Sequence, residues 1–305
     1  MSKAIRRGKM IVTEQTDESV EIFRRIASKQ GGGTSSITSA ISSQTTSLQN
    51  TDFFVRLSAG SISGYSAVNV SGHAYNGLQT TATDVWDRAD ATPTQQLWVA
   101  PTAARIHAIV SSSTSDDGSP AGVGARTVKI WGLTGWSSAE TSETVTLDGT
   151  TPVNTSNAYV IIHRMEVMTA GNTSINVGTI TATAATDGTV TASILPGNGQ
   201  TQMAIYGIPS GKALMVTSFF AGVNRAGNAT PTTDFYFKVN TDPANRTTYR
   251  TQYVLGTSQD GNSWIERVHR PYVTFNGPAI IKVQAISESA DSDGHSGFDG
   301  ILVPV

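Results

Sequence analysis

The sequence predicts an all-β protein with a jelly-roll or immunoglobulin-like β-sandwich body, preceded by a short N-terminal arm that is partly helical and partly extended. Beyond about residue 60 the chain reads as short stretches in which apolar and polar residues alternate. Gly, Asn, Asp and Pro separate these stretches, and no helical repeat lies between them. Many short strands with turn signals at this spacing are typical of a sandwich rather than of a βαβ sheet.

The arm covers residues 1–50 and begins with a predicted helix over about residues 16–30. Ile22, Phe23 and Ile26 form an apolar stripe on this helix, and the three glycines at 31–33 end it and form a flexible linker. A helix of this length is marginal alone and needs a surface to pack on. That surface is either the body of the same chain or a neighbouring subunit, and the glycine linker favours the neighbour.

Residues 34–50 have sparse apolar spacing in a Ser/Thr/Gln-rich stretch. Ile37, Ile41 and Leu48 fall on core positions of a heptad frame, which would make a short parallel stalk and a homotrimer. The Ser and Thr content opposes a long helix, so an extended linker is the alternative.

Charge limits the classes of partner. The net charge is −2 and charged residues are only 14% of the chain, so nothing favours nucleic acid or an anionic membrane. The one basic cluster lies at the start, around Arg6 and Arg7, and is either a solvated tail or a segment that docks on an acidic partner. There is no cysteine, and no apolar run or leader pattern that would predict a membrane span or secretion.

We expect residues 51–95 to form a connecting β segment and residues 96–305 to form the sandwich body. The body is one large sandwich or two tandem or interleaved ones, with a candidate seam near 196–209. The predicted strands are 66–70, 96–100, 105–112, 125–131, 143–147, 159–168, 176–183, 190–195, 203–208, 214–221, 234–240, 247–255, 265–269, 279–286 and 298–303.

No catalytic constellation is apparent, and we expect neither an enzyme nor a cofactor. Three of the five histidines, His107, His163 and His269, lie within predicted strands and read as structural. Carboxylate pairs such as Glu140 and Glu143 are local in sequence, whereas glycoside cleavage requires two acids across a cleft.

Two acidic loops have the composition of a calcium site. One contains Asp116 and Asp117, and the other contains Asp291 and Asp293 in a D-x-D-G arrangement. The second loop lacks the downstream glutamate of an EF-hand, so a polar hairpin turn is the favoured interpretation and no metal is predicted.

Among the tryptophans, Trp98 and Trp131 sit in apolar strands and are expected in the core. Trp136 and Trp264 lie near turns and are the candidates for an exposed contact with protein or glycan, although a partly buried loop anchor is the alternative for each.

Several segments resemble β-rich virion structural proteins of tailed bacteriophages. The resemblance covers about residues 95–225 and more loosely the remainder, and it is carried by WVAPTAA at 98–104, IVSSS at 109–113, GVGARTVKI at 122–130, ETVTLDGTTPV at 143–153, NVGTI at 176–180 and AIYGIPSGK at 204–212. It implies a component of a virus particle and defines no functional residues.

Together these patterns predict a non-enzymatic virion protein of the capsid-decoration, head-fibre or tail-accessory type, made in the host cytoplasm. The arm would attach it to capsid or tail proteins, and the body would project or cement. The alternatives are a receptor-binding adhesin that contacts a host surface glycan and, less favoured, a polysaccharide depolymerase.

Overall fold

The computed structural model describes residues 39, 53–88, 97–224, 232–245, 247–258, 260–261 and 263–305. The chain divides into two compact units, residues 1–63 and residues 64–305. In the described part of the first unit, helix α3 (Phe53–Ser58) buries Leu57. This helix differs from the β structure expected there, because Phe53, Phe54 and Leu57 have the spacing of one helical face.

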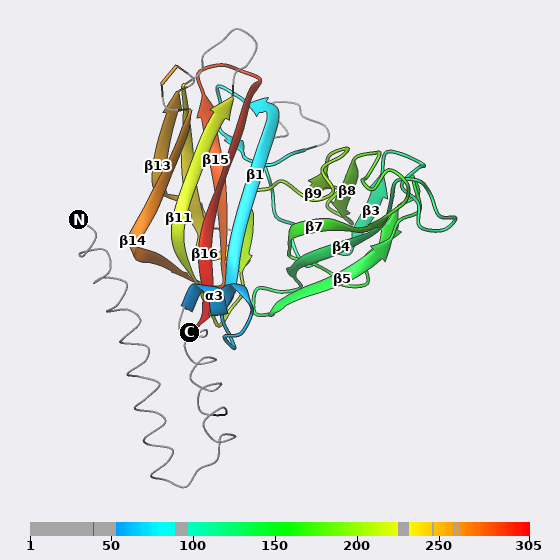
Figure 1. Ribbon diagram of the computed structural model, residues 1–305, viewed down its shortest axis with the longest axis horizontal. Coiled ribbons are helices and arrows are strands. Elements are labelled where there is room, and N and C mark those ends of the chain that lie inside the picture. The colour runs from blue at the N-terminus through cyan, green and yellow to red at the C-terminus, as the bar shows by residue number, and fades with distance from the viewer. Residues whose placement is uncertain are drawn as a thin grey trace, which may run out of the picture. The chain divides into compact units, whose positions relative to one another are not determined.

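The second unit contains two β-sandwiches, which confirms the prediction of an all-β sandwich body (Figure 1). All of its paired strands are antiparallel. One sheet of the first sandwich has the order β1 (Ser66–Leu78), β16 (Ser292–Pro304), β11 (Lys212–Asn224), β14 (Trp264–Asn276). The other has the order β10 (Ile205–Ile208), β15 (Ala279–Ser287), β12 (Thr232–Asn240), β13 (Arg250–Ser258), with β2 (Thr83–Asp84) also paired to β15.

Aromatic rings from both sheets form the centre of the first core. The Phe237 ring of β12 meets Phe219 of β11 and Phe298 of β16 edge-on, at centroid distances of 5.4 and 5.3 Å. All three side chains are fully buried. Burying a side chain of this size stabilises the fold by roughly 1.5–3 kcal/mol, so these rings hold the two sheets together.

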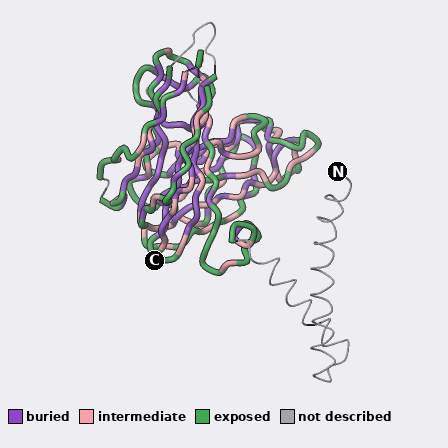
Figure 2. The backbone as a smooth tube through the Cα atoms, turned by 60° about the vertical axis from the view of Figure 1, so that its left-hand side comes forward, coloured by how far each residue is buried: buried purple, intermediate pink, exposed green. Residues whose placement is uncertain are grey.

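The second sandwich has two smaller sheets. Their strand orders are β6 (Val153–Asn154), β3 (His107–Ser111), β8 (Ile180–Ala184), β9 (Val190–Ile194), and β5 (Glu140–Thr146), β4 (Ala125–Leu133), β7 (Ile161–Ala170). Aliphatic side chains such as Ile109, Ile130 and Ile180 fill its core. Buried segments run along the strands of both sandwiches, whereas most loops are exposed (Figure 2).

The two sandwiches are interleaved rather than arranged in tandem. The chain leaves the first sandwich after β2, forms the seven strands of the second that the described residues contain, and returns to the first at β10. The predicted seam at 196–209 includes the segment through which the chain returns to the first sandwich. Within the first sandwich, a short 3-10 helix, η2 (Pro243–Asn245), connects β12 to β13.

Each predicted strand overlaps an observed strand except the one at 96–100, of which residues 97–100 are described and carry no strand. Here the backbone N–H of Trp98 donates to Asp84 Oδ2 (2.7 Å), and the indole Nε1 donates to the Thr191 carbonyl (2.8 Å). Two hydrogen bonds, one to a side chain and one to a backbone carbonyl, therefore fix the buried Trp98, and no strand pairing is involved.

Candidate functional site

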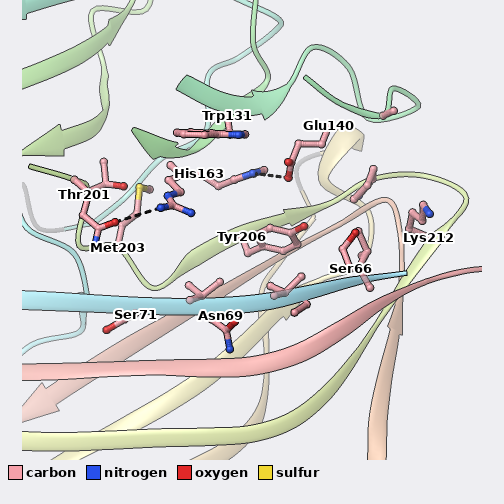
Figure 3. Close-up of a pocket in the computed structure, with 18 of the residues that line it drawn as sticks. Ser66, Asn69, Ser71, Trp131, Glu140, His163, Thr201, Met203, Tyr206 and Lys212 are labelled. Carbon is pink, nitrogen blue, oxygen red and sulfur yellow. Dashed lines mark hydrogen bonds and ion pairs between the residues drawn. The ribbon is translucent and has the colours of Figure 1, made fainter. Parts of the chain in front are cut away.

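A groove with a volume of about 920 Å³ lies between the two sandwiches (Figure 3). Residues 66–71 of β1 form one wall, and β4, β5 and β7 of the second sandwich contribute the other. The segment 200–206, which leads into β10, joins them. β1 is the end strand of its sheet, so this wall is an uncovered strand edge rather than a sheet face.

Three polar groups meet in the groove. His163 of β7 approaches Glu140 at the start of β5, with 3.0 Å between Nε2 and Oε2, and its ring lies 4.7 Å from that of Tyr206 in β10. Burial opposes ionisation of Glu140, but the hydrogen bond and the charge attraction from His163 outweigh it and lower the pKa of this carboxyl. Burial and the nearby Glu140 charge raise the pKa of Tyr206, so its hydroxyl remains a proton donor.

Trp131 of β4 lines the groove beside these groups. Lys129 Nζ lies 4.8 Å and Arg164 Cζ 5.1 Å from its ring centroid. Both contacts follow from the sheet: Lys129 lies two residues before Trp131 on the same face, and Arg164 pairs with Trp131 across the β4–β7 ladder. These cation–π contacts fix the position of the indole.

The lining of the groove does not contain the pair of carboxylates that acid–base cleavage of a glycosidic bond uses. Among its lining residues, all of them described, Glu140 is the one carboxylate, whereas glycoside hydrolysis uses two across the scissile bond. A general acid also needs a raised pKa, and that of Glu140 is lowered. These observations argue against a depolymerase acting here.

A second polar cluster crosses the outer face of the first sheet in a single row. Strand register places His73 of β1 opposite His295 of β16, His295 opposite Gly222 of β11, and Gly222 opposite Trp264 of β14. The His295 ring stacks on Trp264 with centroids 5.1 Å apart, and Phe220 stacks on the same indole at 5.3 Å.

His73, at the β1 end of this row, is its charged member. Its Nδ1 lies 3.1 Å from Asp87 Oδ1 and its Nε2 lies 2.7 Å from Asp293 Oδ1. Hydrogen bonds to Asp293 and Asp87 raise the pKa of His73 to about 10 despite burial. Burial and the positive charge of His73 lower the pKa of His295. The cluster is therefore an imidazolium held between two carboxylates, with a neutral histidine beside it.

The structure brings two of the predicted site residues into this row. Trp264 is 47% exposed, while Asp293 is committed to His73. Asp291 adopts a left-handed turn conformation before β16, and its carboxylate accepts a hydrogen bond from Gln79. No cluster of metal-ligating side chains occurs in the described parts of the chain. Trp136 is half-buried against the core of the second sandwich.

The other predicted site residues lie outside the described residues. They are the arm residues Arg6, Arg7, Ile22, Phe23 and Ile26 and the stalk residues Ile37, Ile41 and Leu48.

The acidic loop at Asp116 is a structural junction and not a calcium site. The fully buried Asp116 accepts four hydrogen bonds within the second sandwich. They come from Ser111 Oγ (2.6 Å), Gly178 N (2.7 Å), Ala125 N (2.8 Å) and Val177 N (2.8 Å). Both carboxylate oxygens are thus satisfied by protein donors. Because the N–H groups of Val177 and Gly178 bond Asp116 instead of a neighbouring strand, β8 begins at Ile180 rather than at residue 176.

The groove is not apparent from the sequence. Trp131 was expected in the core, but it is only half-buried and faces outward with Lys129. The alternation of the strand indicates this orientation, because alternate residues point to opposite faces of a sheet. Lys129 and Trp131 share one face, and the fully buried Val128 and Ile130 share the other. His163 lies within a strand, as predicted, and is buried, yet its position against Glu140 depends on strand pairing that the sequence does not reveal.

The fold and the groove define the class of this protein: an all-β body of two interleaved sandwiches with a polar, aromatic-lined groove between them. No protein-family model and no curated protein matches the chain. Within the described residues, no helix combines the length and the apolar character that crossing a membrane requires.

Proposed function

We propose that the chain is a non-enzymatic structural component of a tailed-phage virion. The resemblance of residues 95–225 to phage virion proteins supports this role, as does a body built almost wholly of strands. In this proposal residues 1–50 attach the protein to capsid or tail proteins, and the sandwiches project from the particle or cement it. The protein is made in the host cytoplasm and acts in the virion as a homotrimer.

The observation that carries the proposal is one side of the first sandwich, on which no further described strand packs. Strands β13 and β14 are the end strands of its two sheets. Four large apolar side chains on them are exposed: Val254 (46%), Trp264 (47%), Val268 (53%) and Tyr272 (37%). The three on β14 lie along one end strand, and exposed apolar side chains on an end strand are typical of a surface that a partner covers.

Charges on β14 indicate how that surface is used. Glu266, Arg267 and Arg270 are exposed on the same strand, and Pro271 has no N–H to donate. Such residues discourage the addition of another strand to an edge. We therefore infer that a second copy of the chain packs side chain against side chain on β13 and β14.

The oligomeric state of the full-length protein tests this contact. Light scattering calibrated for mass should report a trimer for the wild type and a smaller species for Val268→Asp. The matched control is Val123→Asp, since Val123 is similarly exposed (48%) but belongs to the second sandwich. A wild-type monomer, or a trimer that Val268→Asp leaves intact, would contradict the proposed contact.

Attachment is tested separately with particles. Deleting residues 1–33 should leave a folded body that no longer joins virions, because the proposed anchor is gone. Changing Ile22, Phe23 and Ile26 together to Ser should weaken attachment without altering the melting temperature of the body. Wild-type occupancy of the truncated protein would refute the arm as anchor, and a large fall in melting temperature would show that the helix packs on its own body.

A further inference from the structure

We propose that the groove between the two sandwiches binds a neutral oligosaccharide. This inference is independent of where the protein sits in a particle. The volume of about 920 Å³ lies in the range of small-ligand sites, roughly 300–1,000 Å³, and the groove is walled on both sides. A short segment of a sugar chain fits a site of this size and open form.

Ion pairs within the lining of the groove favour a neutral ligand over a strongly charged one. Glu140 is paired with His163, and Arg164 NH2 donates to Glu166 Oε2 at 2.9 Å. The remaining cation, Lys212, donates to the Gly64 carbonyl at 2.7 Å. Glu140 and Arg164 are thus paired within the protein, so an acidic saccharide would meet one charge without a counter-charge, that of Lys212, whose carbonyl partner is neutral.

The uncommitted polar groups match hydroxyl groups. Ser66, Ser71 and Ser137 are exposed in the lining, and Gln202 adds an amide. Hydroxyls and amides both donate and accept hydrogen bonds, as sugar hydroxyls do. Within the described residues, the Tyr206 hydroxyl makes no hydrogen bond, although it remains a protonated donor.

Two further groups favour a sugar over a wholly polar ligand. Trp131 offers an indole N–H that makes no hydrogen bond within the described residues, next to an apolar ring surface. His163 is 92% buried, and its Nδ1 has no partner among the described residues. A buried polar atom without a partner is costly, so a small shift of this ring that let Nδ1 bond a ligand hydroxyl would be favourable. Together they provide the combination of apolar face and convergent polar groups that binds sugar rings.

The test uses the full-length protein and an array of defined oligosaccharides, some built from neutral hexoses and N-acetylhexosamines and others containing uronic acids. Saccharides that bind are then titrated by calorimetry. We expect binding to neutral members. Tyr206→Phe, which removes one hydroxyl and conserves the ring, should weaken it about tenfold, with an unchanged urea midpoint. Trp131→Ala should weaken it by more than about tenfold.

Tyr75→Ala is the matched control, because Tyr75 is an exposed aromatic residue (62%) of β1 that lies outside the lining of the groove. Its affinity should stay within about twofold of the wild type. The proposal is overturned if no array member binds at millimolar concentration, if only uronic-acid saccharides bind, or if Tyr75→Ala alone abolishes binding. It is also overturned if a peptide of residues 1–50 binds and Tyr206→Phe weakens that binding instead, which would make the groove a protein contact.

Discussion

The His295 ring lies stacked on the Trp264 indole, with their centroids 5.1 Å apart and their planes inclined by 23°. They belong to β16 and β14, which are not neighbours, because β11 lies between them. The contact exists because the β11 residue between them is Gly222, which has no side chain. The missing side chain of Gly222 thus allows the exposed Trp264 to contact the row of histidines.

Gly222→Ala should break this contact. A Cβ at this position would lie 2.5 Å from His295 Cε1 and 3.1 Å from Trp264 Cε3, so the rings must separate. We expect the free energy of unfolding to fall by about 1–2 kcal/mol, as for other overpacked sites. Urea denaturation measures it, with Gly261→Ala as control because a Cβ there meets nothing within 4 Å. Equal midpoints for the two variants would show that the stack contributes nothing.

Strand positions in the body could be predicted from sequence because alternation and turn residues are local signals. In Thr127–Trp131, for example, apolar and polar side chains alternate with a period of two residues, and this segment lies in the observed strand β4. Which sandwich a strand joins was not predictable in this way. The insertion of the second sandwich between β2 and β10 depends on long-range pairing, for example Asp84 with Gln284.

The groove and the histidine row were hidden for the same reason. Glu140 and His163 are far apart in sequence, and so are His73 and Asp293. Their chemistry arises from strand register, which one sequence does not display. Asp116 shows the converse, since an acidic loop with the composition of a metal site proves to be a hydrogen-bond acceptor for its own fold.

Asp116→Asn should destabilise the protein strongly. In the wild type, both carboxylate oxygens of Asp116 accept hydrogen bonds from buried donors. The asparagine amide replaces one of these oxygens with an NH2 group, which cannot accept, so the donors that bonded that oxygen lose their partner. We expect a loss of about 3 kcal/mol in the free energy of unfolding. The neighbouring Asp117→Asn is the control, because Asp117 accepts an exposed bond from Ser119 N and should cost less than about 1 kcal/mol. Similar midpoints in urea for both variants would refute the junction role of Asp116.

Lys282→Met should expose the cost of a buried charge. Lys282 Nζ donates to the fully buried Asp84 Oδ2 at 2.8 Å, and burial raises the pKa of Asp84 against the attraction of the Lys282 charge. Removing the lysine leaves this carboxyl without its counter-charge, at a cost of about 3–5 kcal/mol. The double variant Asp84→Asn with Lys282→Met should be less destabilised than the sum of the single variants, as measured by urea denaturation. Strict additivity would show that the two groups do not interact.

The charged state of His73 should make stability depend on pH at the alkaline side. Both ring nitrogens face carboxylates, and only the imidazolium can donate from both. The pKa of His73 is raised from 6.5 to about 10 by Asp293 and Asp87. Its contribution to stability is therefore fully present below pH 6.5 and is lost as the pH rises through 10. The groups facing it are Asp87, Asp293 and His295.

His73→Gln separates this effect from the titration of lysines and tyrosines. The difference in free energy of unfolding between wild type and variant should be largest near pH 5.5 and should shrink steadily at pH 7.5 and 9.5. At the acid side the wild type loses stability again as Asp293, whose pKa is lowered chiefly by the hydrogen bond from His73 acting against burial, takes up its proton. Loss of the His73 charge should also raise the pKa of His295, which NMR titration measures, because that charge now helps to lower it. A difference that stays constant from pH 5.5 to 9.5, with His295 titrating unchanged, would mean that His73 is neutral in the folded protein.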